Sequence, residues 1–187
     1  MSVAAISGLL SGMRNVDEYK YARTEWERRF LLDRLPEHAN IIRVRHIIDR
    51  YINGTTLRLR QEADAELTVF KLTQKLRAVS TGARQGLITT MYLTEDEFRI
   101  LEKLPAQVLK KTRYSVPPFG IDVFEDTLAG LVIAEAEFNS AEEASQWPLP
   151  PFILHEVTDD ARFTGGELVR TSRKELVRLL AEYKLVI

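Results

Sequence analysis

Hydrophobic and polar residues alternate with a period of two along most of the chain, and turn-forming residues separate the alternating runs. This period is typical of β-strands, because successive side chains of a strand point to opposite faces. Asn53-Gly54, between two such runs, is a strong signal for a tight hairpin turn. The pattern predicts about eight strands and a short last one, over residues 24–32, 41–52, 56–60, 67–75, 87–93, 108–116, 119–125, 131–138 and 152–157.

Three segments carry helix signals instead. Thr94 with Glu97 forms a capping box that opens a predicted helix over 95–104, before Pro105. Ser140 caps a short helix, and a capping signal at 171–175 opens a C-terminal helix to about residue 183. Residues 76–86 are polar, contain two glycines and are predicted as a loop.

The predicted fold class is mainly β (α+β): a closed antiparallel β-barrel of about eight strands with flanking helices. Sequential hairpins of this number can close into a barrel that encloses a small ligand. The length of 187 residues suits one domain. We assign residues 1–23 to an N-terminal leader and 24–187 to the barrel domain.

Several of the predicted strands repeat a charged side chain at every second position, so that their charges share one face. In a barrel such a face points into the interior. A solvated sheet face is the competing interpretation, and it weakens as the pattern recurs over several strands. The candidate interior residues are Glu25, Glu27, Arg29, Arg58, Arg60, Lys71, Lys75, Lys111, Arg113, Glu135 and Glu137.

The overall composition hides this segregation of charge. The formal net charge is −1, which gives no sign of a nucleic-acid polymer or a membrane as partner. The chain has no cysteine, which excludes disulfides and thiolate chemistry and fits a reducing compartment, so we expect a cytoplasmic protein. A homodimer is left open.

The candidate interior residues divide by sign into two groups with different chemical preferences. Arginine and lysine match phosphate oxygens, whereas clustered carboxylates suit hard cations such as Mg²⁺ or Mn²⁺. A polyphosphate chelated to a divalent metal ion satisfies both groups. Metal-assisted phosphoryl chemistry is then mostly positioning and neutralisation of charge.

These motifs together resemble the CYTH superfamily, the triphosphate tunnel metalloenzymes. Glu25-x-Glu27-x-Arg29 resembles the ExExK signature of that group, which includes class IV adenylate cyclases, thiamine triphosphatases and inorganic triphosphatases. The similarity runs from about Glu25 to Leu168. The other matching motifs are Arg58-x-Arg60 with Lys71, Lys111-x-Arg113, Ile121-Asp122-Val123-Phe124, Leu128-x-Gly130-Leu131, Glu135-x-Glu137 and Glu156-Val157-Thr158-Asp159.

The resemblance implies roles for these residues. It implies catalytic roles for Glu25, Glu27 and Arg29 and a Mg²⁺ or Mn²⁺ site made by Glu25, Glu27, Asp122, Glu135 and Glu137. It implies that the triphosphate is bound by Arg58, Arg60, Lys71, Lys111 and Arg113.

The chain departs from the family pattern at two places. Arg29 stands where the signature usually has lysine; it keeps the positive charge but not a deprotonatable amine. Ile88 and Thr90 stand where the family often carries a further pair of acids.

The predicted function is metal-dependent hydrolysis of a triphosphate, most simply inorganic triphosphate. The alternatives are a non-catalytic module that binds polyphosphate or a nucleotide, adenylate cyclase-like nucleotide chemistry, and a degenerate tunnel used as a scaffold.

Overall fold

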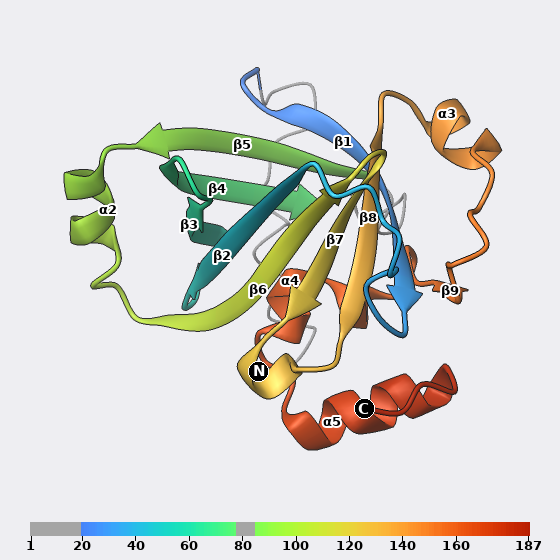
Figure 1. The fold of residues 1–187 in the computed structure, drawn as a ribbon. Coiled ribbons are helices and arrows are strands. Elements are labelled where there is room, and N and C mark those ends of the chain that lie inside the picture. Colours follow the sequence, from blue (N-terminus) through green and yellow to red (C-terminus); the bar gives the residue numbers. More distant parts are fainter. Residues whose placement is uncertain (1–19, 78–84) are drawn as a thin grey trace.

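The computed structural model describes residues 20–77 and 85–187, and an antiparallel barrel lies at its centre (Figure 1). The sheet order is β5-β4-β3-β2-β6-β7-β8-β1-β9, and pairing of β5 with β1 closes the ring of the first eight strands. The strands are β1 (Arg23–Leu32), β2 (Arg43–Ile52), β3 (Leu57–Ala63), β4 (Thr68–Arg77), β5 (Gln85–Leu93), β6 (Ala106–Val116), β7 (Phe119–Phe124), β8 (Val132–Phe138) and β9 (His155–Glu156).

Short helices flank the barrel. They are α2 (Glu95–Leu101), α3 (Ala141–Gln146), α4 (Gly165–Leu168) and α5 (Arg173–Glu182), with 3-10 turns η3 (Asp126–Leu128) and η4 (Ala161–Phe163). Both predicted capping boxes are formed, at Thr94 with Glu97 and at Ser172 with Glu175. Among the described residues, no helix has the length and apolar character needed to cross a membrane.

The predicted barrel is confirmed, with differences at the ends of elements. The loop predicted over 76–86 is shorter, because 76–77 and 86–87 pair as β4 with β5. The first helix ends at Leu101 rather than 104, and a turn bond from Leu104 to Leu101 follows it. The strand predicted over 152–157 shrinks to His155–Glu156, because its start is part of a turn in which Ile153 N–H donates to Pro150 O. Most of the predicted leader, 1–19, lies outside the described residues.

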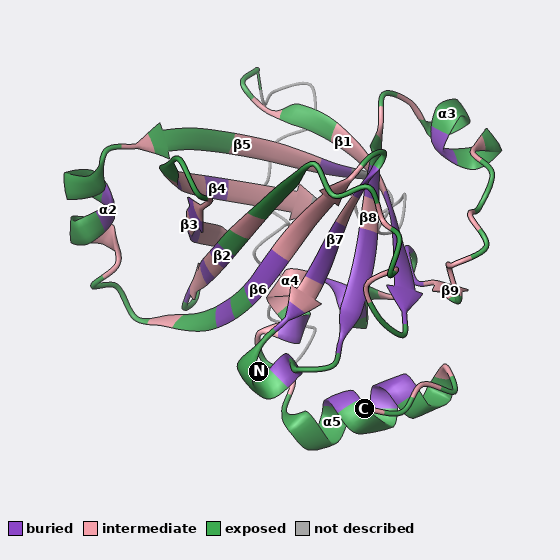
Figure 2. Cartoon of the chain, viewed as in Figure 1, coloured by how far each residue is buried: buried purple, intermediate pink, exposed green. Residues whose placement is uncertain are grey.

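Apolar side chains cover the outside of the barrel. Phe30 and Phe119 lie on the outward face of β1 and β7, where Trp147, after α3, packs 5.1 Å from the Phe119 ring. On the opposite side Phe98 of α2 packs against Phe70 of β4 with ring centroids 4.5 Å apart. The flanking helices therefore bury these outward aromatic side chains, whereas parts of β2, β5 and β6 stay exposed (Figure 2).

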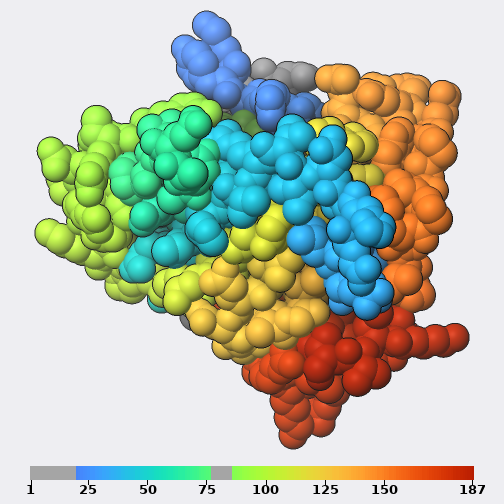
Figure 3. Space-filling model, in the orientation of Figure 1, coloured from blue at the N-terminus to red at the C-terminus, as the bar shows by residue number. Residues whose placement is uncertain are grey.

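At one end of the barrel the inward positions also become apolar. Each of β1, β6, β7 and β8 carries an apolar residue two positions from a charged inward residue, and all four belong to one buried cluster: Leu31, Leu109, Phe124 and Ile133. The C-terminal segment packs beneath them, with the buried face of α5 turned toward the barrel (Figures 2 and 3). These four residues form an apolar floor, and the charged residues lie above it.

Candidate active site

A cavity of about 1080 Å³ occupies the barrel. All eleven interior residues expected from strand alternation line it. Its lining carries nine basic side chains and five acidic ones, so the interior presents an excess of positive charge to a ligand. We call Arg58, Arg60, Lys71, Lys111 and Arg113 the cationic wall, and Glu25, Glu27, Glu135 and Glu137 the acidic wall.

A buried aspartate holds the cationic wall on the β3 side. Asp49 of β2 accepts hydrogen bonds from Arg60 Nε and Nη2 at 2.6 and 2.7 Å, and Arg58 Nε lies 3.6 Å from its Oδ1. Burial would raise the pKa of Asp49, but the charges of Arg60 and Arg58 outweigh it and hold that pKa well below its ordinary value. Asp49 is therefore an anion that fixes Arg60 through two hydrogen bonds and attracts Arg58 without a hydrogen bond.

A second buried aspartate does the same on the β6 side. Asp122 of β7 is fully buried; both its oxygens accept from Arg113 at 2.6 Å, and Lys111 donates to one of them. Gly120 leaves space for this arginine, because a Cβ there would lie 3.2 Å from Arg113 Cδ. Asp122, which the family resemblance implied as a metal ligand, thus lies beneath the cationic wall and does not line the cavity.

The remaining cations of this wall are held less tightly. Lys71 Nζ lies 3.2 Å from Glu62, which also pairs with Arg45. Among the described residues, the buried Nε atoms of Arg58 and Arg29 have no hydrogen-bond partner, and both arginines line the cavity. Two further arginines of the described residues, both outside the cavity, also have a buried Nε without a hydrogen-bond partner. The unpaired Nε atoms therefore support an anionic ligand only together with the positive charge of the wall.

The acidic wall is built by two neighbouring strands. Glu27 of β1 lies directly opposite Glu137 of β8, and Glu135 lies opposite Arg29. Like charges directly opposite each other across an antiparallel pair are destabilising. These carboxylates therefore need cations nearby.

The cations come from other strands. Arg113 donates to Glu135, and Lys75 Nζ lies 3.1 Å from an oxygen of both Glu25 and Glu27. Burial raises the pKa of Glu135, but the charge of Arg113 more than reverses this and lowers it. Burial similarly lowers the pKa of Lys75, and the charges of Glu27 and Glu25 raise it above its ordinary value. Cations of the chain itself therefore lie against both the β1 part and the β8 part of the acidic wall.

The donor chemistry of the acidic wall fits Mg²⁺ or Mn²⁺, because it supplies carboxylate oxygens from two adjacent strands. Within residues 20–77 and 85–187, however, no group of three or more acidic, histidine or cysteine side chains is spaced to hold a metal ion. The Lys75 ammonium lies between the two β1 carboxylates instead. A divalent ion would enter this wall after rearrangement of the internal ion pairs.

Arg29, the last residue of the signature, donates to backbone carbonyls from both of its terminal nitrogens. Its Nη1 donates to Phe163 O at 3.0 Å and its Nη2 to Thr158 O at 2.9 Å, while its Nε lies 3.8 Å from Glu27 Oε1. Its backbone N–H donates to the Thr158 hydroxyl at 3.0 Å. Arg29 therefore ties β1 to the C-terminal segment and offers only its Nε edge to the cavity.

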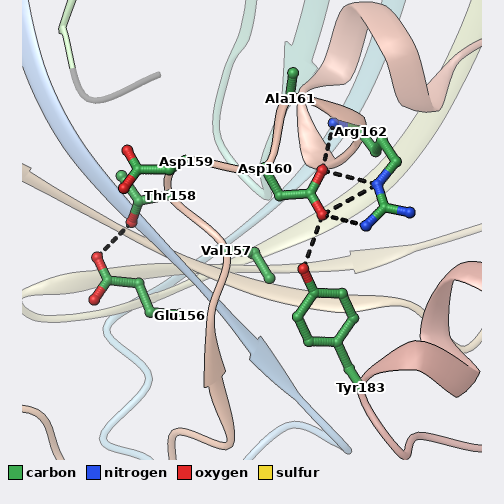
Figure 4. Close-up of a pocket in the computed structure, with 8 residues that line it drawn as sticks. All are labelled: Glu156, Val157, Thr158, Asp159, Asp160, Ala161, Arg162 and Tyr183. Carbon is green, nitrogen blue, oxygen red and sulfur yellow. Dashed lines mark hydrogen bonds and ion pairs between the residues drawn. The ribbon is translucent and has the colours of Figure 1, made fainter. Parts of the chain in front are cut away.

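The turn that follows β9 makes these contacts and forms a separate surface cavity of about 550 Å³ (Figure 4). Glu156 accepts from the Thr158 hydroxyl at 2.7 Å and from Arg28 at 2.7 and 3.0 Å. Asp160 accepts from the Tyr183 hydroxyl at 2.8 Å. The acidic turn thus anchors β1 and α5, which gives its family-like sequence a structural role.

Tyr51 and α4 complete the tunnel. Burial and the neighbouring Asp49 raise the pKa of Tyr51 to about 12, so its hydroxyl is protonated at neutral pH. A Cβ on Gly165 would lie 2.0 Å from that hydroxyl. Gly166 and Arg170 also line the cavity, and no periodic pattern in the sequence placed them there.

A closed antiparallel barrel with a charged interior defines the class of protein: a β-tunnel whose lining carries an excess of positive charge. No family model matches the chain. The inorganic triphosphatase of Nitrosomonas europaea (strain ATCC 19718) is 31% identical to it over 153 residues, which make up 78% of this chain and 96% of that protein.

Two solved structures resemble the fold. That of the inorganic triphosphatase NE1496 has a TM-score of 0.52 and 23% identity and covers 79% of this chain and 95% of its own. The structure of the hypothetical protein NE1496 has a TM-score of 0.53 and 24% identity, and the match covers 79% of this chain and 99% of that one. The chain belongs to the CYTH-like family of triphosphate tunnel proteins that includes the Nitrosomonas europaea triphosphatase.

Proposed function

We propose that the chain hydrolyses a triphosphate inside the tunnel cavity, with inorganic triphosphate as the simplest substrate. The observation that carries the proposal is that a cationic wall and an acidic wall face one cavity of about 1080 Å³. The similarity to a protein named inorganic triphosphatase supports the same reaction. Water would attack the terminal phosphorus, and phosphate and diphosphate would leave.

The cationic wall binds and orients the substrate in this proposal. Arg58 and Arg60 present planar forks that match phosphate oxygens, and Lys71 and Lys111 add point charges. The buried Asp49 holds the two arginines in place before the substrate arrives. Preorganised charges of this kind stabilise a phosphoryl-transfer transition state without reorganising during the reaction.

Mg²⁺ or Mn²⁺ is proposed to bind at the acidic wall, where Glu25, Glu27, Glu135 and Glu137 would hold it. When bound, such an ion neutralises charge on the phosphate oxygens as a Lewis acid. Tyr51, protonated at neutral pH, can donate a hydrogen bond to the substrate at the α4 end of the cavity.

The proposal is tested by phosphate release from tripolyphosphate with Mg²⁺ or Mn²⁺, against a chelated control. Arg58→Ala should weaken tripolyphosphate binding about ten- to hundredfold, the loss of a charge-assisted hydrogen bond. Glu27→Gln should lower the rate of release by at least about tenfold. Matched surface variants, Arg99→Ala on α2 and Glu142→Gln on α3, should leave both quantities unchanged.

A non-catalytic polyphosphate-binding module is the second candidate, and the position of Arg29 favours it. Two of the nitrogens of its guanidinium group donate to backbone carbonyls, so it contributes little to a reacting centre. Tight tripolyphosphate binding by calorimetry, with no phosphate released under any metal condition, would establish the module and rule out the enzyme. ATP assayed in parallel for diphosphate release reports cyclase-like chemistry.

A further inference from the structure

Lys75 lines the tunnel but belongs to neither the cationic wall nor the acidic wall. It stands on β4, yet its Nζ contacts Glu25 and Glu27 on β1, each at 3.1 Å. Strand β5 lies between β4 and β1 in the sheet. The lysine side chain therefore crosses an entire strand, inside the barrel, to reach the signature carboxylates.

The crossing point is shaped for this side chain. Gly86 of β5 pairs with Glu25 on one side and with Arg77 on the other. A Cβ on Gly86 would lie 3.3 Å from Lys75 Cε and 3.9 Å from its Cγ. The absence of a side chain at Gly86 leaves the path that the aliphatic part of Lys75 occupies.

The inward positions of β5 beside Lys75 carry no acidic side chain that would need a further cation. Ile88 pairs directly with Lys75, and Thr90 pairs with Thr73, whose hydroxyl lies 3.1 Å from that of Thr90. The β5 wall is thus uncharged at these inward positions, and the two β1 carboxylates, whose side chains are 11% and 13% exposed, are the acids that Lys75 reaches. Two carboxylates that are buried to this extent are stable as anions only with a cation beside them.

We propose that Lys75 is a tethered cation that occupies the Glu25–Glu27 end of the acidic wall and competes with a divalent metal ion for it. The inference rests on the proposed metal-assisted triphosphatase site. A metal ion binds both carboxylates only after the ammonium withdraws, and the phosphate oxygens of an incoming triphosphate are the anions to which it can move. Metal loading at this end is therefore linked to arrival of the substrate.

The test is metal affinity in the absence of substrate. Mn²⁺ is titrated into the full chain, and the free ion is followed by electron paramagnetic resonance. Lys75→Met keeps the length of the side chain and removes its charge, so it should bind Mn²⁺ at least about tenfold more tightly than the wild type. Lys110→Met, whose lysine pairs with Asp126 on the outer surface, makes the same change in net charge and should bind as the wild type does.

Two further variants keep the test decisive. Lys75→Arg retains the charge and should keep the weak Mn²⁺ affinity. Lys75→Gln is neutral but can donate hydrogen bonds to the carboxylates, so it carries the test if the methionine variant does not fold. Equal Mn²⁺ affinity in the wild type and in the neutral Lys75 variants, or no Mn²⁺ binding by any of them, overturns the inference. Phosphate release by the wild type is measured separately, so failure of the tethered cation is distinguishable from failure of the triphosphatase.

Discussion

The two walls of the tunnel are charged in opposite senses and are built in different ways. Each arginine of the β3 and β6 strands rests on a buried carboxylate, Asp49 or Asp122, which is 1% exposed or less. The glutamates of β1 and β8 rest on cations that reach over one intervening strand, Lys75 over β5 and Arg113 over β7. The cationic wall is therefore supported from beneath, whereas the acidic wall is held from the cavity itself.

The difference teaches which wall can change when a ligand enters. Removing one partner of a buried ion pair with several hydrogen bonds costs the fold several kcal/mol of stability. Such a pair therefore stays intact when a ligand binds. A partly exposed pair is worth little, and a competing ion or phosphate can replace its partner. The cationic wall is suited to fix the substrate, and the acidic wall is suited to exchange its counter-ions.

The largest expected effect is a difference in how much the two walls contribute to the stability of the fold. Asp122→Asn leaves Lys111 and Arg113 without their buried anion and should lower the free energy of unfolding by about 3–5 kcal/mol. Glu137→Gln makes the same chemical change on the exposed part of the acidic wall and should change it by less than about 0.5 kcal/mol. Urea denaturation measures both. Equal losses of unfolding free energy in the two variants would show that the acidic wall contributes as much to the stability of the fold as the cationic wall does.

The next effect is the response of the cationic wall to acid. The folded-state pKa of Asp49 is depressed below its ordinary value of 3.8, so its ionisation stabilises the fold above that value and the contribution is lost as the pH falls. Such a carboxylate contributes about 2 kcal/mol or more. The free energy of unfolding should therefore fall between pH 5 and pH 3, measured by urea denaturation at each pH. A flat profile over this range would contradict a permanently ionised Asp49.

The sequence was sufficient to predict the barrel and the lining because both follow from alternation. The recurrence of charged pairs on several strands, such as Arg58 with Arg60 and Lys111 with Arg113, favoured an interior position for the shared face over a solvated one, and these residues do line the cavity. The residues that hold this lining could not be predicted in the same way. Asp49 is a single acid in a strand of mixed residues, and only the pairing of β2 with β3 shows that it faces Arg60.

The contacts of the signature arginine were beyond prediction for a similar reason. The carbonyl partners of Arg29, Thr158 and Phe163, lie about 130 positions further along the chain in a turn without periodicity. The uses of Gly86 and Gly165 depend on close approaches between elements, and a sequence shows these glycines only as turn or loop formers. Tertiary contacts, rather than local pattern, therefore decide how the two walls are held.

The smallest expected effect tests how the C-terminal segment closes the cationic side. Gly165→Ala places a Cβ 2.0 Å from the Tyr51 hydroxyl, which forces either Tyr51 or α4 to move. Overpacking of this kind should lower the free energy of unfolding by about 1–3 kcal/mol. Gly166→Ala is the matched control, because a Cβ there meets Tyr51 only at 4.0 Å, an ordinary contact. Thermal or urea denaturation of both variants measures the difference. Equal stability would mean that α4 shifts freely against β2, and the α4 end of the tunnel would then be as adaptable as the acidic wall.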